Sequence, residues 1–157
     1  MLNKTEILKT CMMNFQKQVE ELEKAAKSSA SLATDAEHRA KSKYETFSLE
    51  TSYLARGQAK RVVEMRETLS LLNSMELKTF RRDAEIQLGA LVKVRDASGT
   101  ENLYFIVPSG GGEEILIEGQ DVLLVTPHSP VARALLKKRT GQTASFGNKT
   151  LNIMEIS

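Results

Sequence analysis

The first part of the chain carries a hydrophobic pattern that repeats every seven residues. Between Leu2 and Leu32 there is neither Pro nor Gly, and apolar or small side chains recur at alternating spacings of four and three residues, interrupted once by Gln18. This spacing is the coiled-coil pattern, in which one stripe of a helix packs against a partner helix. Mixed charges occupy the other positions, as on a solvated helix face. The stripe consists of Leu8, Cys11, Phe15, Leu22, Ala25, Ser29 and Leu32.

A second helical pattern runs from Tyr44 to Leu77. Gly57 weakens it by about 1 kcal/mol relative to Ala, which a helix of this length tolerates. Two such runs joined by a short polar segment predict an antiparallel coiled-coil hairpin over residues 1–79, with its tip at about 33–44. At about 1.5 Å per residue each arm reaches roughly 45 Å, so the hairpin suits reach or dimerisation better than catalysis. The predicted buried stripe of the second arm is Phe47, Leu54, Val62, Met65, Leu69 and Leu72.

After Phe80 the pattern becomes that of short strands separated by turns. Asp96–Gly99 is a hairpin-type turn, and Gly147-Asn148 is a second turn near the end of the chain. The result is a predicted α+β domain over residues 80–157, with a twisted antiparallel sheet and one short helix. The predicted strands are residues 90–95, 103–107, 114–118, 122–125 and 150–156.

The short helix has clear sequence boundaries. Ser129 is a good N-cap and Pro130 a good first helical residue. Lys137–Arg139 are expected in the last turn, where cations favour the helix dipole, and Gly141 is expected to end the helix. The predicted inward face is Ala132, Leu135 and Leu136.

Composition narrows the function classes. Residues 1–78 carry 13 basic and 11 acidic side chains, and residues 79–157 carry nine of each. Neither half has the one-sided excess of an autonomous nucleic-acid clamp. The single cysteine, Cys11, lies on the apolar stripe, so we expect it in a core and the protein in a reducing cytosol. No signal peptide precedes Asn3 and no apolar run approaches the ~18–20 residues that span a bilayer, so we expect a cytoplasmic protein.

Candidate chemistry is sparse. His38 and His128 have no further His or Cys at ligand spacing, so we expect no metal and no cofactor of the protein's own. Ser109–Gly112 lacks the Lys-Ser/Thr of a phosphate loop and is interpreted as a flexible turn. No nucleophile–base pair can be assembled, which argues against an enzyme. Asp35 and Glu37 at the tip remain, either as solvated turn residues or as acids delivered to a distant site.

The segment from Val125 to Lys138 reads Val-Thr-Pro-His-Ser-Pro-Val-Ala-Arg-Ala-Leu-Leu-Lys-Lys. It resembles the signature of Gre-type bacterial transcription elongation factors, in which Ser-Pro precedes an Ala-Arg-(Ala/Gly)-Leu-(Leu/Ile)-Gly-Lys helix. A helical hairpin followed by this domain is the family's architecture, so the resemblance covers nearly the full chain. It implies an FKBP-like domain that docks on the rim of bacterial RNA polymerase and a hairpin that enters the secondary channel. The implied docking residues are His128, Ser129, Pro130 and Arg133.

The resemblance also implies a role for the tip. In the family, tip acids help to hold a second magnesium ion in the polymerase, which then cleaves its own backtracked transcript. Tyr44 and Tyr53 match the spacing of the family's Tyr and Phe, and this register places the first tip acid at Glu37 and the second at Ala40. Asp35 is the candidate substitute for the missing acid. The basic residues around it are Arg39, Lys41 and Lys43.

Three functions stay open at this stage. The first is a monomeric elongation regulator that contacts transcript or DNA only indirectly and at most stimulates cleavage by the polymerase. The second, favoured by Ala40, is a channel-occupying factor that binds without cleavage. The third is a peptide-binding, chaperone-like adaptor built on the FKBP-like domain, and a hairpin that mediates homodimerisation is a further alternative.

Overall fold

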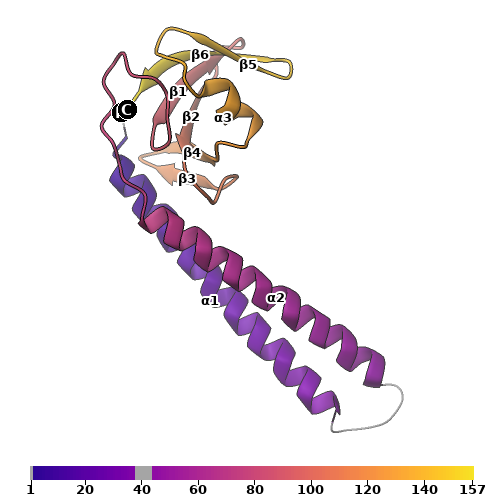
Figure 1. Ribbon diagram of the computed structural model, residues 1–157. Helices are drawn as coiled ribbons and strands as arrows, with labels where there is room; N and C mark the ends of the chain where they lie inside the picture. The colour runs from indigo at the N-terminus through magenta and orange to yellow at the C-terminus, as the bar shows by residue number, and fades with distance from the viewer. Residues whose placement is uncertain (1, 38–43) are drawn as a thin grey trace. The chain divides into compact units, whose positions relative to one another are not determined.

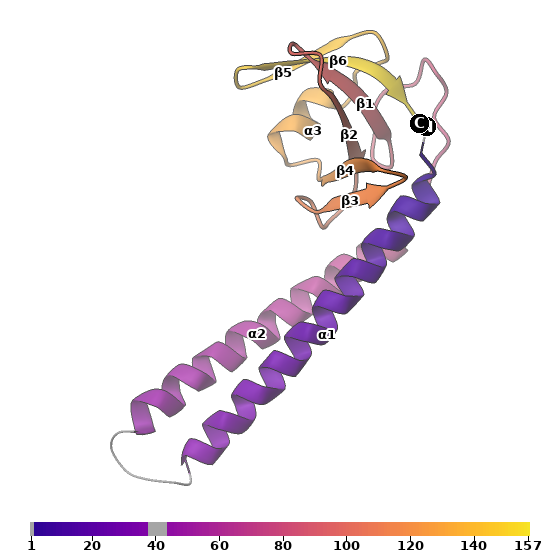
Figure 2. The same ribbon diagram turned by 180° about the vertical axis from the view of Figure 1, so that it is seen from behind.

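The computed structural model describes residues 2–37 and 44–157, and describes side chains within residues 2–32 and 52–157. A helical hairpin is followed by a sheet domain with one short helix, which confirms the predicted architecture (Figure 1 and, from behind, Figure 2). By its internal contacts the chain divides into two compact units, Met13–Ser70 and Met1–Met12 with Leu71–Ser157. Within the described residues, no helix is both long and apolar enough to cross a membrane.

The hairpin consists of α1 (Lys4–Glu37) and α2 (Tyr44–Asn73), which lie side by side in both views. The first helix starts after Asn3, whose side-chain Oδ1 accepts the Thr5 N–H at 2.9 Å, as an N-cap does. The second helix ends four residues earlier than its pattern predicted.

Within the unit Met13–Ser70, the helices are joined by a narrow apolar stripe and by polar contacts. Phe15, Val19 and Val62 are buried, as predicted for Phe15 and Val62. The Ser29 hydroxyl, on a residue only 8% exposed, donates to Gln58 Oε1 of the facing helix at 3.0 Å. An ion pair between Glu23 and Arg66 also connects the two helices.

Two side chains predicted to be buried in this stripe are exposed. Leu54 is 56% exposed and Leu32 is 51% exposed. On α2 the half-buried positions before Val62 include Gln58 and Ala55, which lie four and seven residues earlier. Since successive helix positions differ by about 100°, Leu54 lies one step away from that stripe.

The second unit contains a six-stranded sheet in the order β3-β4-β2-β1-β6-β5. Among the described residues, four of the five strand pairings are antiparallel, and β2 and β4 pair in parallel, with Leu103 opposite Val122. The sheet is therefore mixed, which differs from the wholly antiparallel sheet that the turn spacing predicted. The strands are β1 (Leu91–Asp96), β2 (Glu101–Ile106), β3 (Glu114–Ile117), β4 (Gln120–Val125), β5 (Thr143–Phe146) and β6 (Lys149–Ile156).

One face of the sheet carries the main core of the domain. The helix α3 (Pro130–Leu135) lies against this face in both views. Val131, Ala132 and Leu135 are its buried residues, and they pack with alternate residues of the strands. Each fully buried aliphatic side chain of this kind contributes roughly 1.5–3 kcal/mol by leaving water. Leu136, predicted to face inward as well, packs at the edge of this core and is only partly buried.

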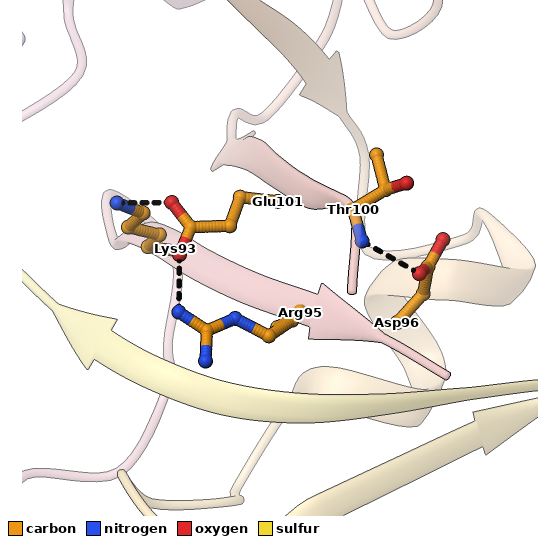
Figure 3. Close-up of polar contacts among 5 residues, drawn as sticks. All are labelled: Lys93, Arg95, Asp96, Thr100 and Glu101. Carbon is orange, nitrogen blue, oxygen red and sulfur yellow. Dashed lines mark hydrogen bonds and ion pairs between the residues drawn. The ribbon is translucent and has the colours of Figure 1, made fainter. Parts of the chain in front are cut away.

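The β1–β2 hairpin is held by a cluster of polar side chains, drawn in Figure 3. Asp96 Oδ1 accepts the Thr100 N–H at 3.0 Å across the predicted turn, and Gly99 has the left-handed φ of +88° that such a turn needs. Glu101 pairs with Lys93 at 2.5 Å and with Arg95 at 2.6 Å. Hydrogen bonds from Lys93 first, and then from Arg95, lower the pKa of the Glu101 carboxyl.

Candidate functional site

The N-terminal end of α3 is the site at which the predicted docking residues lie. Ser129 has extended backbone angles (φ −68°, ψ 147°), and its hydroxyl accepts the Ala132 N–H at 3.3 Å. Pro130 occupies the first helical position, as predicted. A hydroxyl N-cap of this kind stabilises a helix by about 1 kcal/mol. The helix start is therefore fixed by its own sequence.

The outward side of this helix start is polar and accessible. His128, Pro130 and Arg133 are exposed, and Ser129 is partly exposed. Residues three and four positions apart lie on one helix face, so Arg133 shares a face with Ser129 and Pro130. The opposite face is locked into the core through Val131, Ala132 and Leu135. A rigid backbone thus presents these four side chains together.

The helix is shorter than predicted, and its basic residues lie beyond it. Leu136 is the C-cap, and Lys137 has a left-handed φ of +64°. This turn lets the Lys137 N–H donate to Ile86 O at 2.9 Å, while the Ile86 N–H donates to Lys138 O at 2.8 Å. The prediction that Lys137–Arg139 occupy the last helical turn is wrong because the backbone there pairs with the segment before β1. Arg139 forms an exposed ion pair with Glu85 at 3.1 Å.

A hollow of about 360 Å³ opens beside the N-terminal end of α3. Gly111 and Gly112 form one wall, and the other walls are the end of β4, Thr126, Ser129 and Val131. The Gly112 N–H donates to Leu124 O at 2.8 Å, which holds the glycine turn alongside β4. A Cβ on Gly111 would lie 3.0 Å from Thr126 Cγ2, so a larger residue here would fit only if its neighbours moved by a few tenths of an ångström.

The role of the glycine turn differs from the prediction. Ser109–Gly112 was predicted as a flexible turn, yet the turn is hydrogen-bonded to a strand and borders the hollow next to Ser129. The available signal was its position directly before β3, whose pairing with β4 brings the glycines to the strand end. An isolated glycine run does not reveal which strand it will lie against.

The predicted tip acids lie at the far end of α1. The backbone is helical through Glu37, so residues 33–37, predicted to begin the turn, belong to the last turns of α1. Ala33 and Ala36 favour helix, which explains this extension. The side chains of Asp35 and Glu37 lie outside those the structure describes, as do residues 38–43, which include His38, Arg39, Ala40, Lys41 and Lys43. In the described parts of the chain, no three His, Cys, Asp or Glu side chains form a metal site.

Cys11 is buried, as predicted for a core residue. Burial raises the pKa of its thiol to about 12, and the negative charge of Glu113 adds to this effect. At neutral pH the side chain is therefore a protonated thiol, which is a poor nucleophile.

Comparison with known proteins identifies a family for the second half of the chain. Residues 81–157 match the family model described as transcription elongation factor, GreA/GreB, C-terminal. Two crystal structures, GreA factor homolog 1 (Gfh1) of Thermus thermophilus and Gfh1 of Thermus aquaticus, are each 18% identical to this chain, with a TM-score of 0.38. The alignments cover 93% and 94% of this chain and 94% of each of theirs. Comparison with curated proteins gives no match.

Proposed function

We propose that this protein binds RNA polymerase and regulates elongation. The chain belongs, through its residues 81–157, to the GreA/GreB family of transcription elongation factors. The docking part is the domain 80–157, and the hairpin 1–79 reaches into the secondary channel of the enzyme. The protein is a cytoplasmic monomer in this proposal, and it has no active site of its own.

The observation that supports docking through α3 is the rigid presentation of a compact exposed surface. Pro130 and Arg133 are exposed on one side of a helix whose other side is core, and Ser129 caps that helix. A surface of this kind loses little conformational entropy on binding because its backbone is already fixed. His128 extends the surface by one exposed residue before the cap.

Capture of core RNA polymerase tests this proposal. Immobilised wild-type protein is compared with Pro130→Ala and Arg133→Ala, and with Lys149→Ala, which removes an exposed cation at the β5–β6 turn. We expect Arg133→Ala to weaken binding by about threefold to tenfold, or roughly 0.6–1.4 kcal/mol, and Lys149→Ala to leave it within about twofold. Failure of the wild-type protein to capture polymerase would eliminate the proposed function. Equal losses in the Arg133 and Lys149 variants would show a general charge effect instead of docking through α3.

For the tip we propose that Glu37, with Asp35, contributes carboxylate oxygens to a magnesium ion shared with the polymerase. Magnesium keeps an octahedral set of oxygen ligands and usually takes only one or two from protein carboxylates, so two tip acids suit a partial site. The ion would polarise the scissile phosphate and activate water.

The alternative is a factor that occupies the channel without promoting cleavage, and the sequence feature that favours it is Ala40 at the aligned second acid position. A stalled, backtracked polymerase separates the two functions. Shortened transcripts with the wild type, lost with Glu37→Gln and retained with Glu20→Gln on the exposed side of α1, support shared magnesium. Binding without any shortened transcript assigns channel occupation.

A further inference from the structure

The basic and acidic side chains of the sheet domain are segregated along the chain. Residues 79–121 carry eight acidic and four basic side chains, whereas residues 122–154 carry five basic side chains and no Asp or Glu. The first segment contains β3 and the second contains β5, and these strands lie at opposite edges of the sheet (Figure 1). The asymmetry of charge is therefore also an asymmetry across the domain. The five cations of the second segment are Arg133, Lys137, Lys138, Arg139 and Lys149.

Three of these cations form a basic ridge, which consists of Arg133, Lys137 and Lys138. Arg133 is exposed on α3, and the turn after this helix carries Lys137, which is exposed, and Lys138, which is partly exposed. Four residues of a helix rise by only about 6 Å, so the three side chains start close together. Among the described residues, none of the three forms an ion pair.

The acidic residue next to the ridge is already neutralised. Glu85 precedes Ile86, whose N–H and C=O bond to the backbone of Lys138 and Lys137. The Glu85 carboxylate pairs with Arg139 at 3.1 Å, and Arg139 lies outside the ridge as defined. The ridge therefore keeps its positive charge for a partner from outside the chain.

Lys137 holds its place in the ridge against a cost to the fold. Its φ of +64° is left-handed, a conformation that Gly adopts freely and that strains a residue with a Cβ. The turn is needed because it brings the backbone to Ile86, but its backbone hydrogen bonds do not require a lysine. The Lys137 side chain is exposed, so core packing does not explain the residue either. Strain of this kind is often stored at functional sites.

The ridge continues the surface through which α3 is proposed to dock. Arg133 belongs to both, since it shares a helix face with Ser129 and Pro130 and lies one turn before Lys137. A partner that covers the start of α3 and Arg133 therefore reaches the ridge as well.

Resting on the proposed function, we propose that the basic ridge contacts an acidic protein surface of RNA polymerase. Asp or Glu carboxylates on that surface accept hydrogen bonds from Arg133, Lys137 and Lys138. Charge pairs at the rim of an interface steer association and set specificity. A protein surface fits better than nucleic acid, because residues 79–157 carry nine charges of each sign and lack the one-sided excess of a nucleic-acid clamp.

The test is to replace Lys137 by Gly in the full chain and to measure both stability and capture of core polymerase. Lys137→Gly should raise the urea midpoint, because it removes the strained Cβ, and yet weaken capture by about threefold or more at about 50 mM salt. The loss should shrink at about 300 mM salt, where exposed charges are screened. Lys137→Arg keeps the cation and should capture polymerase within about twofold of the wild type without a rise in the midpoint. Lys149→Ala is the control for a cation outside the ridge.

The outcomes separate this inference from the proposed function. Wild-type capture that Lys137→Gly leaves unchanged would overturn the ridge and leave the proposed function intact, whereas failure of the wild type to capture polymerase would overturn both. Equal losses in Lys137→Gly and Lys149→Ala would show a general charge effect and refute the ridge. A Lys137→Gly variant that loses stability together with capture would assign Lys137 a structural role instead.

A second measurement tests nucleic acid as the partner. The protein without polymerase is titrated with a labelled single-stranded RNA and a labelled DNA duplex at the same two salt concentrations. We expect no saturable binding to either probe. Binding that Lys137→Gly weakens would assign the ridge to phosphates and overturn the acidic protein surface.

Discussion

Replacement of Gly111 by Ala tests whether the glycine turn is fixed against the end of β4. The added Cβ would lie 3.0 Å from Thr126 Cγ2 and 3.1 Å from the Thr126 backbone N. The backbone atom cannot rotate away, and the Thr126 carbonyl is held by the Ser129 N–H at 2.9 Å. The turn itself must therefore move, against the hydrogen bond from the Gly112 N–H to Leu124 O.

Overpacking of this kind costs about 1–3 kcal/mol of unfolding free energy, and we expect Gly111→Ala to fall in that range. The assay is urea unfolding of the full chain, monitored by a probe in the sheet domain, with the slope of the transition unchanged. The same movement should distort the hollow beside Ser129, so polymerase capture should weaken in parallel. A loss of less than about 0.3 kcal/mol would show that the turn adapts freely and would refute this reasoning.

Two further variants identify the cause of the loss. Thr126→Ser removes Cγ2, the nearest atom, and should recover part of the loss in the double variant, with a coupling of about 0.5–1 kcal/mol. Gly112→Ala is the matched control, since nothing lies within 4 Å of its Cβ but its φ is +95°. Its cost, about 1–2 kcal/mol, comes from the left-handed backbone, and Thr126→Ser should not reduce it.

Three other variants or reactions test separate parts of the structure. Ser129→Ala should lower the unfolding free energy by about 0.5–1 kcal/mol through loss of the N-cap, and Ser129→Asp should retain it; equal stabilities by urea unfolding would contradict the capping role. Cys11 should resist alkylation by iodoacetamide at pH 8 in the folded protein, because burial raises the pKa of its thiol to about 12, and it should react once urea unfolds the chain. Rapid labelling in the absence of urea would contradict the buried position. Because folding lowers the pKa of Glu101, this carboxylate adds to the free energy of unfolding above its ordinary pKa of 4.5. That stabilisation is lost as the pH falls through the lower pKa of the folded state. Stability measured between about pH 6 and pH 3 should therefore fall less steeply for Glu101→Gln than for the wild type, and identical slopes would argue against the pairing with Lys93 and Arg95.

Much of the fold could be predicted from local pattern, because its signals lie within single elements. The seven-residue repeat specifies the hairpin, and the Ser129-Pro130 cap specifies where α3 begins. The end of α3 could not be predicted in this way, since Lys137 leaves the helix to pair with Ile86, about fifty residues earlier in the chain. Local propensity does not report such distant pairing.

The contrast between local signals and distant pairing also explains which strands and which parts of the site could be predicted. The parallel pairing of β2 with β4, and the strand β5, depend on which segments become neighbours in the sheet. That the proposed docking residues lie close together could be predicted, because they are contiguous at one helix start. The glycine wall of the adjacent hollow could not be predicted, because Gly111 lies next to Thr126, which belongs to a separate segment of the sequence.

The pairing of Ile86 with the residues after α3 has a consequence for the limits of the domain. Ile86 is fully buried, and its N–H and C=O both bond to the Lys137–Lys138 turn. Residues 84–86 are thus an integral part of the globular fold, although they precede the first strand and read as connecting chain. A fragment that began at β1 would leave the Lys137 N–H and the Lys138 C=O without partners and open a gap at Ile86. A sheet domain that folds on its own therefore has to include the segment around Ile86 that follows the hairpin.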